Sequence, residues 1–207
     1  MKRRVMDRKP LFMKKQHIEG DLNGFFSAFL IKKRLEVLKP YLKGKKRILD
    51  VGCGIFRMGP LLPSNAEYTG IDFADSIIAY NKSRFNHAFY CLDVEQNSLP
   101  DFGKPFDLII MLAAIEHFAD PVPVLMKLKA HLSPDGVIVF TTPHPCGERV
   151  LNIGSELGLF SRDKDQHHAL MPFGEIKKLS RLAGFDLVAY KRFLFGFNQL
   201  AVLTDAK

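Results

Sequence analysis

From residue 47 onward, short apolar runs alternate along the chain with longer amphipathic segments. Seven of these runs are rich in β-branched and aromatic residues, which is typical of β-strands. They are residues 47–52, 67–72, 88–93, 106–112, 136–142, 185–193 and 198–204. Segments long enough for a helix lie between most of them, for example residues 120–132 and 171–185. This alternation predicts a mostly parallel sheet with helices on both faces.

The last two runs are separated by only "LFGF", residues 194–197. A crossover between parallel strands needs many more residues, so these two runs should pair antiparallel. Five strand–helix steps followed by this pair predict an α/β fold. The expected architecture is a three-layer sandwich around a seven-strand, mostly parallel sheet.

Two segments lie outside this pattern. Residues 21–42 read as an amphipathic helix that packs beside the sheet and could cover a ligand, so we expect a helical cap at 21–44. Residues 143–171 form a long connection between the fifth strand and its helix, and such insertions are commonly functional. The predicted organisation is a basic arm at 1–20, the cap, and a catalytic domain at 45–207 with the insertion near its active site.

The composition is that of a soluble protein. With 207 residues, 47% hydrophobic and 25% charged, the chain is long enough for one α/β domain with a substantial core. No apolar stretch approaches the length of a transmembrane helix, and the first residues lack the apolar segment of a secretory signal. The three cysteines are far apart, which argues against a disulfide framework. We therefore expect a cytoplasmic protein with no transmembrane segment.

Positive charge is concentrated at the start of the chain. Residues 1–47 hold 15 Lys and Arg against 4 Asp and Glu, a local charge of +11 within a total of +8. Such a segment could contact nucleic acid, an anionic lipid or an acidic substrate. A solvated tail followed by the exposed face of a helix is the simpler interpretation.

The sequence "ILDVGCGIFR", residues 48–57, runs from a strand into a turn with glycines at Gly52 and Gly54. Such a turn lets the backbone approach a ligand at the carboxyl end of the sheet. The dinucleotide pattern G-x-G-x-x-G needs glycine where this chain has Arg57, and no phosphate-binding loop pattern occurs. Asp50, at the strand end, suits an amine-bearing ligand better than a pyrophosphate, which a carboxylate repels.

The next two strands also end in carboxylates. Asp72 follows Gly54 by eighteen residues, where a carboxylate can accept hydrogen bonds from a ribose diol. Asp93 ends the third strand, where it could accept from an adenine amino group. Each aspartate taken alone could instead cap a following helix. Three such strand ends in a row favour a ligand that contains adenosine.

Successive segments now show a family resemblance. "RILDVGCGIFR", "YTGIDFADSII", "CLDVE", "FDLIIMLAAIEHFADP", "LSPDGVIVFTTP" and "MPFGEIKKLSRLAGFDLV" resemble the motifs of class I S-adenosylmethionine-dependent methyltransferases. The likeness spans residues 45–204 and is nearest to the small-molecule branch that includes quinone-biosynthesis enzymes. It implies S-adenosylmethionine as cofactor, with the methionine end, the ribose, the adenine and the transferred methyl each near particular residues. These are Asp50, Gly52 and Gly54 for the methionine end, Asp72 for the ribose, Asp93 and Val94 for the adenine, and Met111 and Leu112 for the methyl.

One position departs from the family pattern. Members of the family usually carry glycine where this chain has Phe56. A phenyl ring there would either form a wall against the cofactor or partly block it.

Methyl transfer is an in-line displacement in which the protein mainly aligns the nucleophile and excludes water. A base is needed only if the acceptor carries a proton. Candidates are Glu116 and His117 just past the fourth strand, His167 (with its neighbour His168) in the insertion, and His144 at the end of the fifth strand. Glu116 and His117 could instead merely orient the next helix.

A metal-binding pattern is incomplete. Some relatives implied by the resemblance bind a divalent metal through E-x-x-E-H and a later histidine, but this chain has Ala113 at the first glutamate position. We therefore predict no metal.

Three functional hypotheses follow. The first is methyl transfer to a small-molecule acceptor, an oxygen nucleophile on a lipid-like or aromatic compound. The second is RNA methylation, with the basic arm contacting phosphates. The third is a non-catalytic binding protein whose cofactor loop is closed by Phe56.

Overall fold

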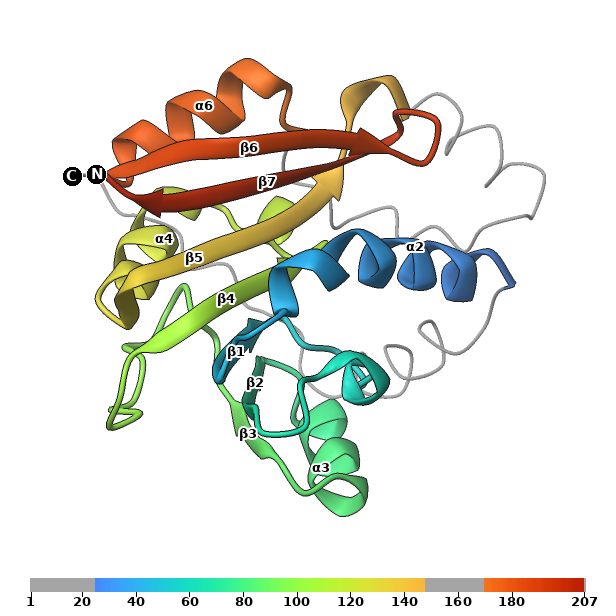
Figure 1. Cartoon of the computed structure of the whole chain (residues 1–207), viewed down its shortest axis with the longest axis vertical. Coiled ribbons are helices and arrows are strands. Elements are labelled where there is room, and N and C mark those ends of the chain that lie inside the picture. The colour runs from blue at the N-terminus through green and yellow to red at the C-terminus, as the bar shows by residue number, and fades with distance from the viewer. Residues whose placement is uncertain (1–24, 148–169, 207) are drawn as a thin grey trace, which may run out of the picture.

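The computed structural model describes residues 25–147 and 170–206. Its centre is a seven-stranded sheet in the order β3-β2-β1-β4-β5-β7-β6 (Figure 1). The strands are β1 (Arg47–Val51), β2 (Glu67–Asp72), β3 (Ala88–Cys91), β4 (Phe106–Leu112), β5 (Leu132–Pro143), β6 (Phe185–Phe193) and β7 (Asn198–Asp205). The first five strands pair in parallel, whereas β7 is antiparallel to both β5 and β6. The predicted fold class and the antiparallel final pair are confirmed.

Helices cover both faces of this sheet. They are α2 (Phe25–Leu42), α3 (Asp75–Arg84), α4 (Pro121–Lys129) and α6 (Phe173–Leu182), with short 3-10 turns η1 (Gly59–Leu61), η2 (Ile115–His117) and η3 (Pro145–Gly147). Within the described segments, no helix is long and apolar enough to cross a membrane.

The prediction of five strand–helix steps is wrong at two of them. The connection from β1 to β2 contains only η1, and no helix lies between β3 and β4. Both connections are long enough for a helix but carry residues that disfavour one. These are Gly52, Gly54, Gly59, Pro60 and Pro63 in the first, and Pro100, Gly103 and Pro105 in the second. The third predicted strand also ends earlier than expected, at Cys91.

Two apolar layers bury the faces of the sheet, because successive strand residues point to opposite sides. On one face, Leu49 and Ile109 pack with residues of α4 and α6. On the other face, Ile48 and Ile110 pack with residues of α2 and α3. These layers hold α2 over the carboxyl ends of β4 and β5 (Figure 1), where the predicted cap would stand.

Candidate functional site

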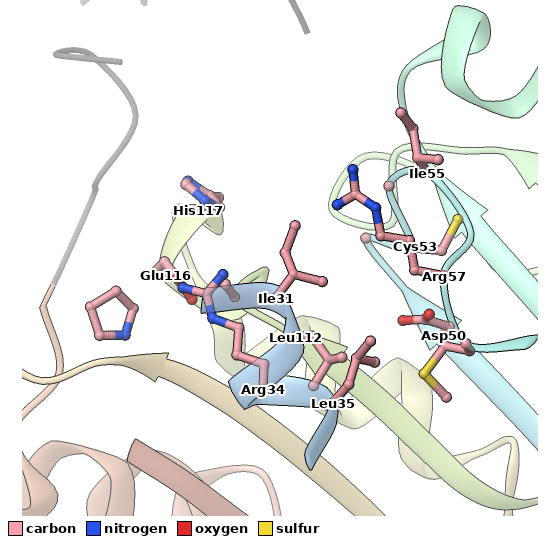
Figure 2. Close-up of a pocket in the computed structure, with 15 residues that line it drawn as sticks. Ile31, Arg34, Leu35, Asp50, Cys53, Ile55, Arg57, Leu112, Glu116 and His117 are labelled. Carbon is pink, nitrogen blue, oxygen red and sulfur yellow. The ribbon is translucent and has the colours of Figure 1, made fainter. Parts of the chain in front are cut away.

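A cavity of about 370 Å³ opens at the carboxyl ends of β1 and β4, between α2 and the glycine-containing turn (Figure 2). Its lining comes from α2, from the loop after β1, from the segment after β4 and from the end of β5. The lining residues are Ile31, Arg34, Leu35, Asp50, Gly52, Cys53, Gly54, Ile55, Arg57, Met58, Leu112, Ala113, Glu116, His117 and Pro143. The carboxyl edge of a parallel sheet is where such folds bind ligands.

The glycine-containing turn is fixed by its neighbours. Gly52 has a φ of +72°, and a Cβ on it would lie 2.6 Å from the Cβ of Ala114. Its N–H donates to the carbonyl of Ile71 at 2.8 Å. The side chain of Asn81 on α3 donates to the carbonyl of Gly54 at 2.8 Å. Position 52 therefore needs glycine, both for its backbone conformation and because Ala114 leaves no space for a side chain.

Asp50 is a buried carboxylate at the floor of the cavity, with only 4% of its surface exposed. Its Oδ2 accepts a 2.7 Å hydrogen bond from the Tyr68 hydroxyl. Within the described part of the chain, its Oδ1 has no hydrogen-bond partner. Burial raises the pKa of Asp50 from 3.8 to about 7, opposed by the Tyr68 hydrogen bond and reinforced by the charge of Asp72. A cation or donor in the cavity would satisfy Oδ1 and favour the charged form.

Asp72 lies behind the turn and is not part of the cavity lining. Its Oδ2 accepts from the N–H of Gly54 at 3.0 Å, and its Oδ1 accepts from the N–H of Ala74 at 2.9 Å. Asp72 thus supports both the turn and the start of α3.

Asp93 also lies outside the lining. Its Oδ1 accepts from the N–H of Glu95 at 3.0 Å, which closes the turn that follows β3. Val94 is buried in the core on the α4 side, as is Met111. Of the residues expected near the cofactor, the cavity brings together Asp50, Gly52, Gly54 and Leu112. The ribose and adenine roles stay predictions.

Two arginines in the cavity wall were not predicted from the sequence to be binding residues. Arg34 and Arg57 line the cavity from opposite sides, one on α2 and one in the loop after β1 (Figure 2). Arg34 also lies near β7, with its Nη2 3.5 Å from the Oδ1 of Asn198. The signal for Arg34 was the spacing of Ile31, Arg34 and Leu35, which places all three on one face of a helix.

Glu116 and His117 lie together in η2, directly after β4. Both line the cavity, on the side opposite Asp50 and Arg57 (Figure 2). Glu116 is only 1% exposed, and its Oε2 has no hydrogen-bond partner among the described residues. The preceding Ala113 has a φ of 55°, and strained backbone of this kind is found at functional sites. The structure therefore brings the first pair of candidate bases into the cavity.

The other two candidate bases are not in this group. His144 is absent from the lining, and its Nδ1 accepts from the N–H of Cys146 at 3.1 Å. Partial burial, together with the charge of Arg192, lowers the pKa of His144. His167 lies outside the described residues. Across residues 25–147 and 170–206, no three His, Cys, Asp or Glu side chains gather closely enough to hold a metal ion.

Phe56 points away from the cavity. Its ring packs into an aromatic cluster with centroids 4.8 Å from those of Tyr68 and Phe85, and 5.9 Å from that of Phe89. Its N–H donates to the side chain of Asn81 at 3.0 Å. The expectation that Phe56 would wall or block the cavity is wrong, because the turn directs this ring into the core. Phe56 therefore does not close the cofactor loop.

Substitutions at the adjacent positions 55 and 56 should have different effects, because Ile55 lines the cavity whereas Phe56 packs in the core. Phe56→Leu should lower the free energy of unfolding by about 1–2 kcal/mol, through lost aromatic packing, and change cofactor affinity by less than about twofold. Ile55→Ala, at a residue that lines the cavity, should weaken cofactor binding clearly. Urea denaturation and calorimetric titration measure the two effects. An affinity loss at Phe56→Leu as large as that at Ile55→Ala would contradict this assignment.

Comparison with known proteins finds similarity to methyltransferases. A family model described as "Methyltransferase domain" matches residues 23–190. The chain is 37% identical over 114 residues to a malonyl-[acyl-carrier protein] O-methyltransferase of Acetivibrio thermocellus, covering 52% of this chain and 39% of that protein. It is 30% identical over 135 residues to a ubiquinone biosynthesis O-methyltransferase of Actinobacillus pleuropneumoniae, covering 59% and 58%. The matched segments thus span between about two fifths and three fifths of these two relatives.

Solved structures share the fold. The plantazolicin methyltransferase BpumL, in complex with a triazolic desmethylPZN analogue and SAH, superposes with a TM-score of 0.69 at 18% identity, over 95% of this chain and 92% of that one. Magnesium protoporphyrin IX methyltransferase from Synechocystis, with bound SAH, gives a TM-score of 0.66 at 17% identity, over 94% of each chain. The family match covers most of the chain, and the sheet order and the cavity fit it. The chain therefore belongs to the methyltransferase domain family, as a class I S-adenosylmethionine-dependent domain.

Proposed function

We propose that this chain transfers the methyl group of S-adenosylmethionine to an oxygen nucleophile on a small-molecule acceptor. When bound, the cofactor supplies an electrophilic methyl group on a sulfonium. The observation that carries the proposal is the buried Oδ1 of Asp50, which faces a cavity in a methyltransferase domain and has no partner in the described structure. A buried carboxylate oxygen in this state is strongly stabilised by a cationic donor.

The charges around the cavity fit the methionine end of the cofactor. Its ammonium would lie at Asp50, and its carboxylate would be held by Arg34 or Arg57, since arginine binds carboxylates through paired donors. Gly52 and Gly54 would allow the backbone to approach, as expected from the sequence. Asp72 and Asp93 would extend the site toward the ribose and the adenine, because carboxylate oxygens accept hydrogen bonds from hydroxyl and amino groups.

Glu116 and His117 would act on the acceptor. A hydroxyl acceptor must lose its proton as the methyl is transferred, so a base within hydrogen-bond reach accelerates the reaction. Glu116 is the better candidate for this base, because it lines the cavity and its Oε2 has no hydrogen-bond partner among the described residues. The two relatives described above are named as O-methyltransferases, which supports an oxygen acceptor.

The test of this role is methyl transfer to a panel of phenols, catechols and carboxylic acids. Glu116→Gln should lower kcat for a hydroxyl acceptor by about 10²-fold or more, whereas cofactor affinity should stay nearly unchanged. His117→Gln should lower kcat less. Glu175→Gln, an exposed acid on α6, is the matched control and should have no effect. Unchanged kcat in Glu116→Gln would contradict the base role.

A further inference from the structure

The hairpin that joins β6 to β7 has a strained turn. Leu194 and Phe195 have φ angles of 51° and 55°, followed by Gly196 at 87°. The N–H of Gly196 donates to the carbonyl of Phe193 at 3.0 Å, which closes a tight turn. Bulky side chains disfavour this left-handed backbone, and such turns normally carry asparagine or glycine. A conformation of this kind persists only where the surroundings enforce it, and it points to a functional role.

Contacts on the inner side of the turn hold it in place. The guanidinium of Arg192 donates to the carbonyl of Gly196 through both Nε and Nη2, at 3.1 and 2.8 Å. The N–H of His144 donates to the carbonyl of Phe197 at 2.8 Å. Leu194 packs against the core on the α2 side. The turn is thus anchored through every residue except Phe195.

Phe195 is 95% exposed, the largest exposed fraction among the large apolar residues of the described chain. A single exposed apolar residue is ordinary, but one held outward on a strained and anchored turn is not. A second aromatic residue, Phe29 on α2, is 41% exposed. The N-terminal half of α2 and this hairpin project from the same side of the molecule (Figure 1). The Arg34–Asn198 contact joins the two elements.

Basic residues lie close to both rings along the chain. Lys191 and Arg192 are exposed directly before the turn. On α2, Lys32 is exposed and the ammonium of Lys33 lies 5.7 Å from the centroid of the Phe29 ring. An apolar ring flanked by lysine and arginine is the pattern by which proteins bind the surface of an anionic bilayer. The ring enters the acyl boundary while the cations bind headgroups.

We propose that the hairpin tip, residues 193–197, and the face of α2 that carries Phe29 and Lys33 form a docking surface. This surface binds an anionic lipid bilayer, into which Phe195 inserts. The tip adjoins the candidate active site, because Asn198 pairs in register with Pro143, which lines the cavity. Docking would therefore bring the cavity close to the lipid surface. The proposal concerns where the enzyme works and does not depend on the identity of the acceptor.

Co-sedimentation of the full chain with lipid vesicles tests this surface. The wild type should sediment with vesicles that contain phosphatidylglycerol, much less with phosphatidylcholine alone, and less as salt is raised. Phe195→Asn should weaken binding by about tenfold or more, the loss expected for removing one buried ring. Asparagine tolerates left-handed backbone, so the same variant should keep or raise the melting temperature. Lys191→Gln should weaken binding about fivefold.

The matched control is Leu182→Asn. Leu182 is 60% exposed, but it ends α6, at the far end of β6 from the hairpin tip. Its substitution should leave vesicle binding unchanged. Failure of the wild type to bind anionic vesicles, equal binding to both kinds of vesicle, or wild-type binding by Phe195→Asn would each overturn the proposal. A dimer that Phe195→Asn dissociates, without vesicle binding, would overturn it in favour of a protein contact.

Discussion

Gly52→Ala should abolish detectable cofactor binding and destabilise the fold. The added Cβ would lie 2.6 Å from the Cβ of Ala114, far inside van der Waals contact, and the alanine would have to adopt a φ of +72°. Together these should cost about 2–5 kcal/mol. The turn can relieve the clash only by moving, which displaces the backbone next to Asp50. We expect affinity to fall by about 100-fold or more, measured by calorimetric titration of S-adenosylhomocysteine.

Two further variants separate the effect of the positive φ from that of the clash with Ala114. Gly103→Ala meets the same conformational demand, at a φ of +74°, but has no atom within 4 Å of the added Cβ. It should cost only about 1–2 kcal/mol and leave cofactor affinity intact. Combining Gly52→Ala with Ala114→Gly removes the clashing Cβ and should restore part of the binding. If the double variant binds no better than Gly52→Ala alone, steric crowding by Ala114 is not the reason.

Cofactor affinity should decline as the pH falls through about 7, because Asp50 must be charged to hold an ammonium. Its pKa is raised to about 7 by burial, so the ionised fraction falls about tenfold for each pH unit below that value. Calorimetric titration of S-adenosylhomocysteine should therefore show an affinity that rises with pH and levels off above about pH 7.

The same carboxyl affects the stability of the ligand-free chain with the opposite sign. Because folding raises the pKa of Asp50 from 3.8 to about 7, the folded state binds more protons than the unfolded state between these values. Its contribution to stability is complete below pH 3.8 and is lost as the pH rises through about 7. Urea denaturation across this range should show that decline in the wild type.

Asp50→Asn is the matched control for both effects. The amide can still accept the Tyr68 hydrogen bond but does not titrate. It should bind S-adenosylhomocysteine weakly, with no loss on the acidic side, and its stability should lack the decline toward about pH 7. If the acidic loss of affinity persists in Asp50→Asn, another group is responsible.

Much of the fold could be predicted from the sequence because the strands carry a strong local signal. The runs at 106–112 and 185–193 coincide with β4 and β6, and the four-residue link before β7 allows only antiparallel pairing. The helices expected after β1 and β3 could not be excluded by length alone. Glycine and proline in those connections decided against them.

The site was predictable only in part, for a geometric reason. Asp50 lies near the end of β1 and Glu116 follows β4. The carboxyl ends of these two strands meet at one edge, so the place of both residues in the cavity follows from topology. Arg34 depends on how α2 rotates against the sheet. The direction of Phe56 depends on the turn and on the aromatic cluster that receives it. Neither packing detail is visible in the periodicity of the sequence.

The most direct test of the central claim compares S-adenosylhomocysteine with 5′-methylthioadenosine, which lacks the amino-acid end, by calorimetric titration into the wild type and Asp50→Asn. If the cavity beside Asp50 holds the methionine end, the wild type should bind S-adenosylhomocysteine with micromolar affinity and 5′-methylthioadenosine far more weakly. Asp50→Asn should weaken the first ligand and leave the second unchanged, a coupling that isolates this contact. Equal affinities for the two ligands, or equal effects of Asp50→Asn on both, would contradict the account.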